Sequence, residues 1–264
     1  MVRQTTQEVL RLENVTKSFG NVQALNGVSL AVGDGEVVAL LGDNGAGKST
    51  LIKAISGLHG VDSGDIYIGG KKAEIRSARD AMNLGIETIH QDSSLAVDLS
   101  IARNLFLGRE PVRASFLGPL APLDLAQLKR QASELLKRVG IKKNLDADAP
   151  IRALSGGERQ SIAISRAMHF FAKIIILDEP TNNLGVEETH GVLNFIREVR
   201  DAGHTVIYIT HNIHHVFQVA DRIVIMRQGT IVADIDAADT DILEVEAIIT
   251  GADRRELAAE VRRK

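Results

Sequence analysis

The sequence contains no cysteine and no tryptophan, and only 3% of its residues are aromatic. Without cysteine the chain can form neither a disulfide framework nor a thiolate metal site, which fits a reducing compartment. The scarcity of aromatic residues argues against a base-stacking platform. The formal net charge of -3 gives no electrostatic case for nucleic acid as the main partner. We therefore expect no nucleic-acid partner.

Long apolar runs are also missing. The N-terminal residues lack the apolar centre of a signal peptide, and no run approaches the ~18 residues of a membrane span. We expect a soluble, cytoplasmic protein that another chain must hold if it acts at a membrane. A length of 264 residues allows one large α/β domain, with or without an inserted subdomain.

A glycine-rich loop stands between an apolar stretch at 36–41 and a helix-like stretch at 51–55. It contains Gly42, Asp43, Asn44, Gly45, Ala46, Gly47, Lys48, Ser49 and Thr50. The glycines leave room for backbone N–H groups to close around phosphate oxygens, and the helix start adds partial positive charge. Lys48 adds a full charge, and the Ser49 hydroxyl is placed to ligate Mg²⁺. A chance match to this pattern is rare, so the sequence predicts a nucleotide site.

Upstream of this loop, 9–13 and 28–32 alternate as strands do. We place Phe19 in a loop between them. A lone phenylalanine is more often part of the core, but an adenine ring needs a stacking face and few aromatics are available. We therefore interpret Phe19 as a contact to the base.

Three further strands end in polar residues. The strand at 85–92 delivers Gln91, the apolar strand at 173–179 delivers Asp178 and Glu179, and the strand at 205–210 leads to His211. Strand carboxyl ends face the ligand crevice in an open α/β sheet. Asp178 suits a place behind Mg²⁺, Glu179 a general base, and His211 a contact to a γ-phosphate. A solvated strand end for Gln91 and a structural histidine remain the alternatives.

Between Leu95 and Ala153 the sequence indicates a mostly helical insert, with helices at 100–107 and 124–139. It is followed by Ser155, Gly156, Gly157 and Glu158. Ser155 and Glu158 have the spacing of a capping box, so this segment can be simply a well-capped helix start. Two glycines in a first turn are unfavourable, however, and suggest the close approach of a phosphate.

With these motifs in this order, the chain resembles the ATP-binding cassette (ABC) ATPases over essentially its whole length, and Leu154 to Glu158 matches the family signature. The resemblance implies a P-loop α/β core with a mixed sheet, flanking helices and an N-terminal antiparallel β-subdomain. It implies that Phe19 stacks on adenine, that 42–50 binds ATP, and that Ser49, Gln91 and Asp178 hold Mg²⁺. It further implies that Lys48, Glu179 and His211 are catalytic, and that the signature closes over the nucleotide of a second cassette in an ATP-bound homodimer.

The stretch 99–111 looks like that of ribose, xylose and fructose importer ATPases. This likeness implies carbohydrate import through membrane permease subunits and a sugar-binding protein, with the chain peripheral at the inner face of the membrane. Two departures stand out: Gly185 replaces a common aspartate, and only one cassette is present. Another ABC transporter, or a non-transport ABC ATPase acting as a conformational switch, remains the alternative.

We expect one ABC ATPase domain over 1–264, divided into a nucleotide-binding core at 1–92 and 155–235, the helical insert at 93–154, and a helical tail at 236–264.

Overall fold

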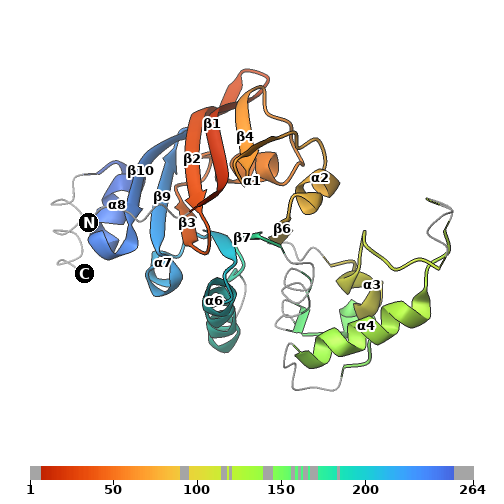
Figure 1. The fold of residues 1–264 in the computed structure, drawn as a ribbon. Helices are drawn as coiled ribbons and strands as arrows, with labels where there is room; N and C mark the ends of the chain where they lie inside the picture. The colour runs from red at the N-terminus through yellow and green to blue at the C-terminus, as the bar shows by residue number, and fades with distance from the viewer. Residues whose placement is uncertain are drawn as a thin grey trace. The chain divides into compact units, whose positions relative to one another are not determined.

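The computed structural model describes residues 7–89, 95–113, 118, 121–138, 145–155, 158–159, 162, 166, 172–182 and 185–252. The chain forms two compact units, Met1–Thr88 with Ala172–Lys264 and, separately, Ile89–Phe171. Figure 1 follows the elements along the chain. In the described residues, no helix combines the length and the apolarity that crossing a membrane requires. The predicted boundaries of the insert, 93 and 154, stay a prediction.

The first unit begins with an antiparallel sheet in the order β2-β1-β4-β5. Its strands are β1 (Glu8–Phe19), β2 (Val22–Gly33), β4 (Ser63–Ile68) and β5 (Lys71–Ala73). The predicted strands are thus present, but β1 and β2 are longer than the apolar alternation indicates. Several register shifts let β1 continue through polar residues, and pairing of Phe19 with Val22 closes the hairpin.

The second sheet of this unit has the order β10-β9-β3-β8-β7-β6. Its strands are β3 (Val37–Leu41), β6 (Ile86–Ile89), β7 (Ile174–Asp178), β8 (Thr205–Ile209), β9 (Arg222–Arg227) and β10 (Thr230–Asp236). Strand β3 pairs in parallel with β8 and β9, and β7 pairs in parallel with β8. Strands β9 and β10 form an antiparallel hairpin with Gln228 and Gly229 at its turn. The mixed sheet and the antiparallel sheet confirm the predicted fold class.

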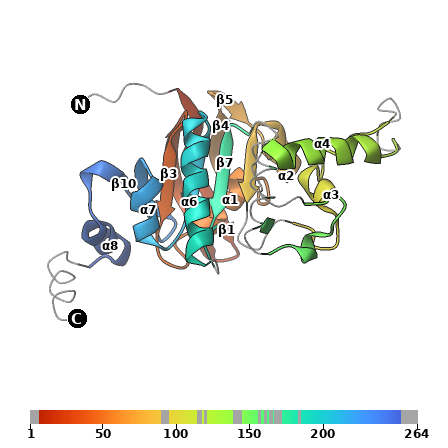
Figure 2. The same ribbon diagram turned by 90° about the horizontal axis from the view of Figure 1, so that it is seen from below.

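Helices cover both faces of the second sheet. They are α1 (Lys48–Ile55), α2 (Ala78–Asn83), α6 (Val186–Asp201), α7 (Ile213–Val219) and α8 (Ile242–Thr250), and a short 3-10 turn, η3, spans Ala237–Asp239. Helix α6 buries Val192, Leu193, Ile196 and Val199, which lie on one face of the helix, and it packs on β8. Figure 2 shows α6 in front of the strands of this sheet.

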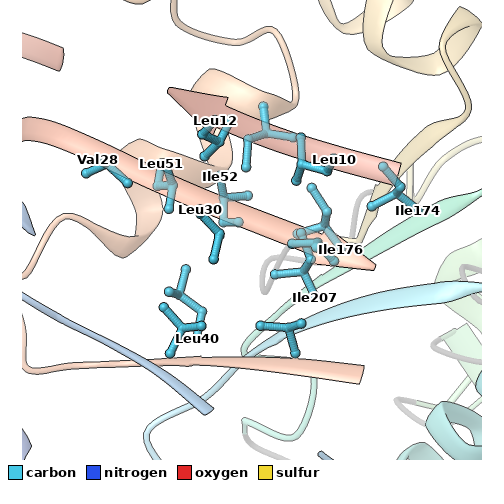
Figure 3. Packing of buried hydrophobic residues seen from close by; sticks show 14 of the residues in the cluster. Leu10, Leu12, Val28, Leu30, Leu40, Leu51, Ile52, Ile174, Ile176 and Ile207 are labelled. Carbon is cyan, nitrogen blue, oxygen red and sulfur yellow. The ribbon is translucent and has the colours of Figure 1, made fainter. Parts of the chain in front are cut away.

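The main core of the first unit lies between the two sheets. Leu51 and Ile52 of α1 point into a cluster with side chains of β1, β2, β3, β7 and β8, as Figure 3 shows. These labelled core residues are almost completely buried. Helix α1 is therefore clamped between the sheets, and the loop that precedes it has a rigid base.

The second unit contains α3 (Ile101–Leu105), α4 (Leu125–Arg138) and a 3-10 turn, η2 (Ile151–Ala153). Helix α3 packs on α4, and Asp124 caps α4 by accepting a hydrogen bond from the Gln127 N–H at 3.0 Å. Both predicted helices are confirmed. Asn104 is fully buried, and its side chain holds the Ala96 backbone through hydrogen bonds of 2.7 and 3.0 Å.

Candidate functional site: a phosphate loop facing two carboxylates and a histidine

The loop between β3 and α1 has a backbone that only glycine fits at two points. Gly42, Gly45 and Gly47 have φ values of 146°, 80° and 104°. A Cβ on Gly42 would lie 2.3 Å from the Met226 carbonyl oxygen, and one on Gly47 would lie 2.6 Å from that of Ala24. The sequence thus specifies a tight loop that runs against neighbouring backbone.

Helix α1 begins without a side-chain cap. Gly47 is its N-cap, no side chain accepts from its first N–H groups, and its first turn contains no acidic residue. Free N–H groups and the helix dipole make such a start a site for an anion. Ser49 is exposed there and Thr50 is half-buried, so a bound anion can reach the hydroxyl of Ser49.

The half-buried ammonium of Lys48 folds back over the loop. Its Nζ donates to the carbonyl oxygens of Gly42 at 2.7 Å and Asp43 at 3.0 Å. Burial lowers the pKa of Lys48, and the negative charges of Glu179, Asp43 and Asp178 act in the opposite direction. The fold thus brings the two predicted carboxylates of β7 within electrostatic reach of the predicted phosphate-binding lysine.

Glu179 follows β7 in a left-handed conformation, with φ of 51°, and its N–H donates to the Ile209 carbonyl oxygen at 2.9 Å. His211 follows the adjacent strand, and its Nδ1 lies 3.1 Å from Glu179 Oε2. The Glu179 side chain is 15% exposed and that of His211 is 69% exposed. Both residues are predicted from the sequence, but their contact is not, because it depends on the pairing of β7 with β8. A non-glycine residue with positive φ is strained, which is common at functional sites.

Phe19 is the last residue of β1, so its placement in a loop was wrong. The strand reaches it because Phe19 still pairs with Val22 across the hairpin. Its ring is 45% exposed and lies 5.3 Å from the His59 ring, edge to face. Lys17 Nζ lies 5.6 Å from the Phe19 ring centroid and 2.7 Å from Asp62 Oδ1. No local sequence pattern indicates these neighbours, which come from β1 and from the loop after α1.

The remaining predicted site residues belong to the second unit, and the structure describes only some of them. Gln91, Gly156 and Gly157 lie outside the described residues. Ser155 and Glu158 form the predicted capping box: Ser155 N–H donates to Glu158 Oε2 at 2.8 Å, and Glu158 N–H donates to Ser155 Oγ at 3.2 Å.

Beside the loop is a hollow of about 380 Å³, whose lining includes Gly42, Asp43, Thr210 and His211. Among the described side chains, no group of three histidines or carboxylates could hold a metal ion by itself. The donors at the loop, a serine hydroxyl and one or two carboxylates, instead suit Mg²⁺ that arrives on nucleotide phosphates, because Mg²⁺ keeps several ligands from substrate and water.

The sequence is similar to those of known proteins over most of its length. A family model described as "ABC transporter" matches residues 25–182. The chain is 44% identical to the xylose/arabinose import ATP-binding protein XylG of Sulfolobus acidocaldarius, over 92% of this chain and 94% of that protein. It is 41% identical to the fructose import ATP-binding protein FrcA of Rhizobium meliloti, over 93% and 95%. A ribose import ATP-binding protein of Caldanaerobacter subterraneus is 36% identical over 95% of this chain but only 49% of its own length.

Solved structures give the same result for the fold. The chain is similar to the ADP conformation of an ATP-binding cassette of an ABC transporter, with a TM-score of 0.77, 28% identity, and coverage of 96% of this chain and 99% of that one. It is also similar to a nucleotide-free ATP-binding cassette, with a TM-score of 0.76, 27% identity and coverage of 92% and 95%. The chain therefore belongs to the ABC transporter family and is one of its ATPase cassettes.

Proposed function

We propose that the chain is the ATP-hydrolysing subunit of an ABC importer for a carbohydrate, such as the monosaccharides xylose, fructose or ribose. The observation that carries this proposal is the identity of 44% and 41% to a xylose/arabinose and a fructose import protein, each over more than nine-tenths of both chains. The uncapped loop facing Lys48, Glu179 and His211 supplies the chemistry that such a subunit requires.

In the proposed mechanism, the N–H groups of 42–50 and the Lys48 ammonium bind the ATP phosphates, while Phe19 stacks on adenine. The exposed ring of Phe19 and the start of α1, which has no side-chain cap, support these roles. Ser49 and Gln91 would hold Mg²⁺, with Asp178 behind them. When bound, Mg²⁺ would supply positive charge that offsets the negative charge of the phosphates.

Glu179 would accept a hydrogen bond from the attacking water and polarise it, while His211 contacts the γ-phosphate. The distance of 3.1 Å between His211 Nδ1 and Glu179 Oε2 supports this division, because both groups can then act on one phosphate. The Lys48 ammonium is within electrostatic reach of Glu179, so its charge can act on the same phosphate. Positioning and electrostatic stabilisation would supply most of the rate enhancement.

We further propose that Ser155, Gly156, Gly157 and Glu158 act on the nucleotide of a second copy, so that ATP is bound in a homodimer. A similar solved cassette, with a TM-score of 0.69 and 25% identity, is described as dimeric in a post-hydrolysis state with ADP and Pi. The helical unit would face separate permease subunits, which would place the chain at the inner face of the membrane.

Sedimentation of the Glu179→Gln protein with and without Mg-ATP tests the shared site. The variant keeps the binding groups but loses the base, so we expect an ATP-dependent shift from monomer to dimer. The double variant Lys48→Ala, Glu179→Gln is the control and should stay monomeric. A monomer in all conditions would contradict the shared site.

Uptake of labelled sugars tests the carbohydrate assignment. Cells in which Glu179→Gln replaces the unaltered chain should lose uptake of xylose, fructose or ribose, whereas amino-acid uptake should be unchanged. Normal uptake of all three sugars would contradict import of these monosaccharides.

A further inference from the structure

The turn between β9 and β10 is hydrogen-bonded to the loop 42–50, which we call the phosphate loop. The Gly229 N–H donates to the Ala46 carbonyl oxygen at 3.0 Å, and the Gly229 carbonyl oxygen accepts from the Asn26 N–H at 2.8 Å. Gly229 therefore links the centre of the phosphate loop to strand β2 through both of its backbone polar groups.

The packing at this point leaves no room for a side chain. Gly229 is buried, its φ is 77°, and a Cβ on it would lie 2.9 Å from the Ala24 carbonyl oxygen. From the other side, a Cβ on Gly47 would lie 2.6 Å from the same oxygen and 3.3 Å from Gly229 Cα. Three backbone segments thus meet at contact distance, and none can shift without moving the others.

The hydrogen bond to Ala46 fixes the direction of a group that the proposed function uses. The Ala46 carbonyl and the Gly47 N–H belong to one planar trans peptide unit, in which the two groups point in opposite directions. Because Gly229 holds the carbonyl on its own side, the Gly47 N–H is directed away from the turn. That N–H stands at the uncapped start of α1, where phosphate would bind.

We propose that the β9–β10 turn positions the phosphate loop, and that Gly229 is a positioning residue for binding of the triphosphate chain. This inference rests on the proposed function, since it concerns the same ATP site. The turn acts on the phosphate-binding backbone and not on the base, so it affects ATP and inorganic tripolyphosphate to the same extent.

The matched pair Gly229→Ala and Gly70→Ala tests the proposal. Gly70 also has φ of 77° and also lies in a hairpin turn, but no atom lies within 4 Å of its added Cβ. Both variants therefore carry the same backbone strain, and only Gly229→Ala disturbs the loop. We expect affinity for ATP and for tripolyphosphate, measured by calorimetry on folded protein, to fall about tenfold in Gly229→Ala, the scale of one backbone hydrogen bond. In Gly70→Ala we expect no change.

Hydrogen exchange of the unaltered chain gives a second measurement that does not depend on the folding of a variant. Saturating ATP should slow exchange at the Gly229 and Asn26 amides, because binding immobilises the loop to which they are tied. Exchange at the amides of the β4–β5 turn should not change. A merely structural turn would be protected equally with and without ATP.

The outcomes separate the two levels of the argument. If the unaltered chain does not bind ATP, the proposed function fails and this inference fails with it. If it binds ATP but the two glycine variants have equal affinities, or if Gly229→Ala does not fold and exchange at Gly229 is unaffected by ATP, only the role of the turn is overturned.

Discussion

At the end of the second sheet where β3, β8 and β9 begin, several polar side chains have protein partners, although Arg222 Nε is buried without one among the described residues. The Asp221 carboxylate accepts from the Val37 N–H at 2.8 Å, and the Thr205 hydroxyl accepts from the Gly35 N–H at 2.9 Å and donates to the Gly33 carbonyl at 3.0 Å. Arg222 lies 2.8 Å from Glu36 and 3.0 Å from Asp234. This end is finished without a ligand.

At the opposite end, where β3 and β7 finish, groups are left uncapped or strained. Helix α1 lacks a side-chain cap, Lys48 is partly desolvated, and Glu179 has positive φ. By contrast α2, α3, α7 and α8 each begin with a side chain that accepts from the first turn. Four other helices of the chain are thus capped by side chains, and the uncapped start of α1 fits the phosphate-binding role proposed above. In open α/β sheets, ligands bind at the carboxyl ends of the strands, and the uncapped and strained groups lie at that end.

Lys48→Ala should have the largest effect at the end of the sheet where β3 and β7 finish, which we call the ligand end. We expect ATP affinity to fall at least about a hundredfold, or about 3 kcal/mol, because a charge-assisted contact to phosphate is lost. Calorimetric titration measures the affinity, and chemical denaturation should show little loss of stability. ATP binding at the parent affinity would contradict the role of Lys48.

Arg222→Ala, at the end of the sheet where β3, β8 and β9 begin, should have the converse effect: a loss of stability without a loss of ATP affinity. Arg222 is the cation paired with Glu36 and Asp234, and its side chain is only 7% exposed. Its removal therefore leaves both carboxylates without this partner. We expect a loss of about 2–3 kcal/mol in the free energy of unfolding, with ATP affinity unchanged.

The triple variant Arg222→Met, Glu36→Gln, Asp234→Asn is the control for this prediction. It removes the three charges together, so it should recover most of the lost stability. If Arg222→Ala weakened ATP binding as strongly as Lys48→Ala, the two ends would not be independent.

The phosphate loop, most strands and two helix starts, at Asp124 and at Ser155, could be predicted from the sequence because their signals are local. Gly42 to Thr50 lies between an apolar strand and a helix, and Asp124 stands immediately before an amphipathic helix. Ser155 and Glu158 stand three residues apart, as a capping box requires. In each case a few neighbouring residues determine the conformation.

The features that could not be predicted depend on residues far apart in the chain. Phe19 is in a strand because of its pairing with Val22 and the register shifts of β1. Arg222 contacts Glu36 from 186 positions away. The approach of Gly229 to Ala24 and the contact of His211 with Glu179 arise only when the sheets assemble. A local pattern cannot encode such contacts.

A smaller effect on stability is expected at Glu179, whose backbone is strained in the folded chain. Glu179→Gly and Glu179→Ala both remove the carboxylate, but alanine keeps a side chain at φ of 51°. We expect the glycine variant to be more stable by about 1 kcal/mol, although glycine makes the unfolded chain more flexible. Both variants should lose ATP hydrolysis. An alanine variant as stable as the glycine variant would show that the backbone there is not strained.

The smallest expected effect concerns α7, which follows His211 at the ligand end. Burial lowers the pKa of His215 below its ordinary value of 6.5, and the nearby histidines 214, 190 and 211 lower it further. As pH falls below 6.5, the unfolded chain therefore binds a proton more readily than the folded chain does, and the free energy of unfolding decreases. The decrease should end once the pH passes the lowered pKa of the folded state.

Denaturation of His215→Gln at a series of pH values measures this contribution. The variant should lose less stability than the unaltered chain between pH 6.5 and the lowered pKa, because the group that titrates differently in the two states is gone. His214→Gln, at an exposed position of the same helix, is the control and should keep most of the slope. An unchanged slope in His215→Gln would assign the acid sensitivity to other groups. A reduced slope would show that the ligand end carries a desolvation cost at His215 as well as at Lys48, in contrast to the matched pairs around Arg222.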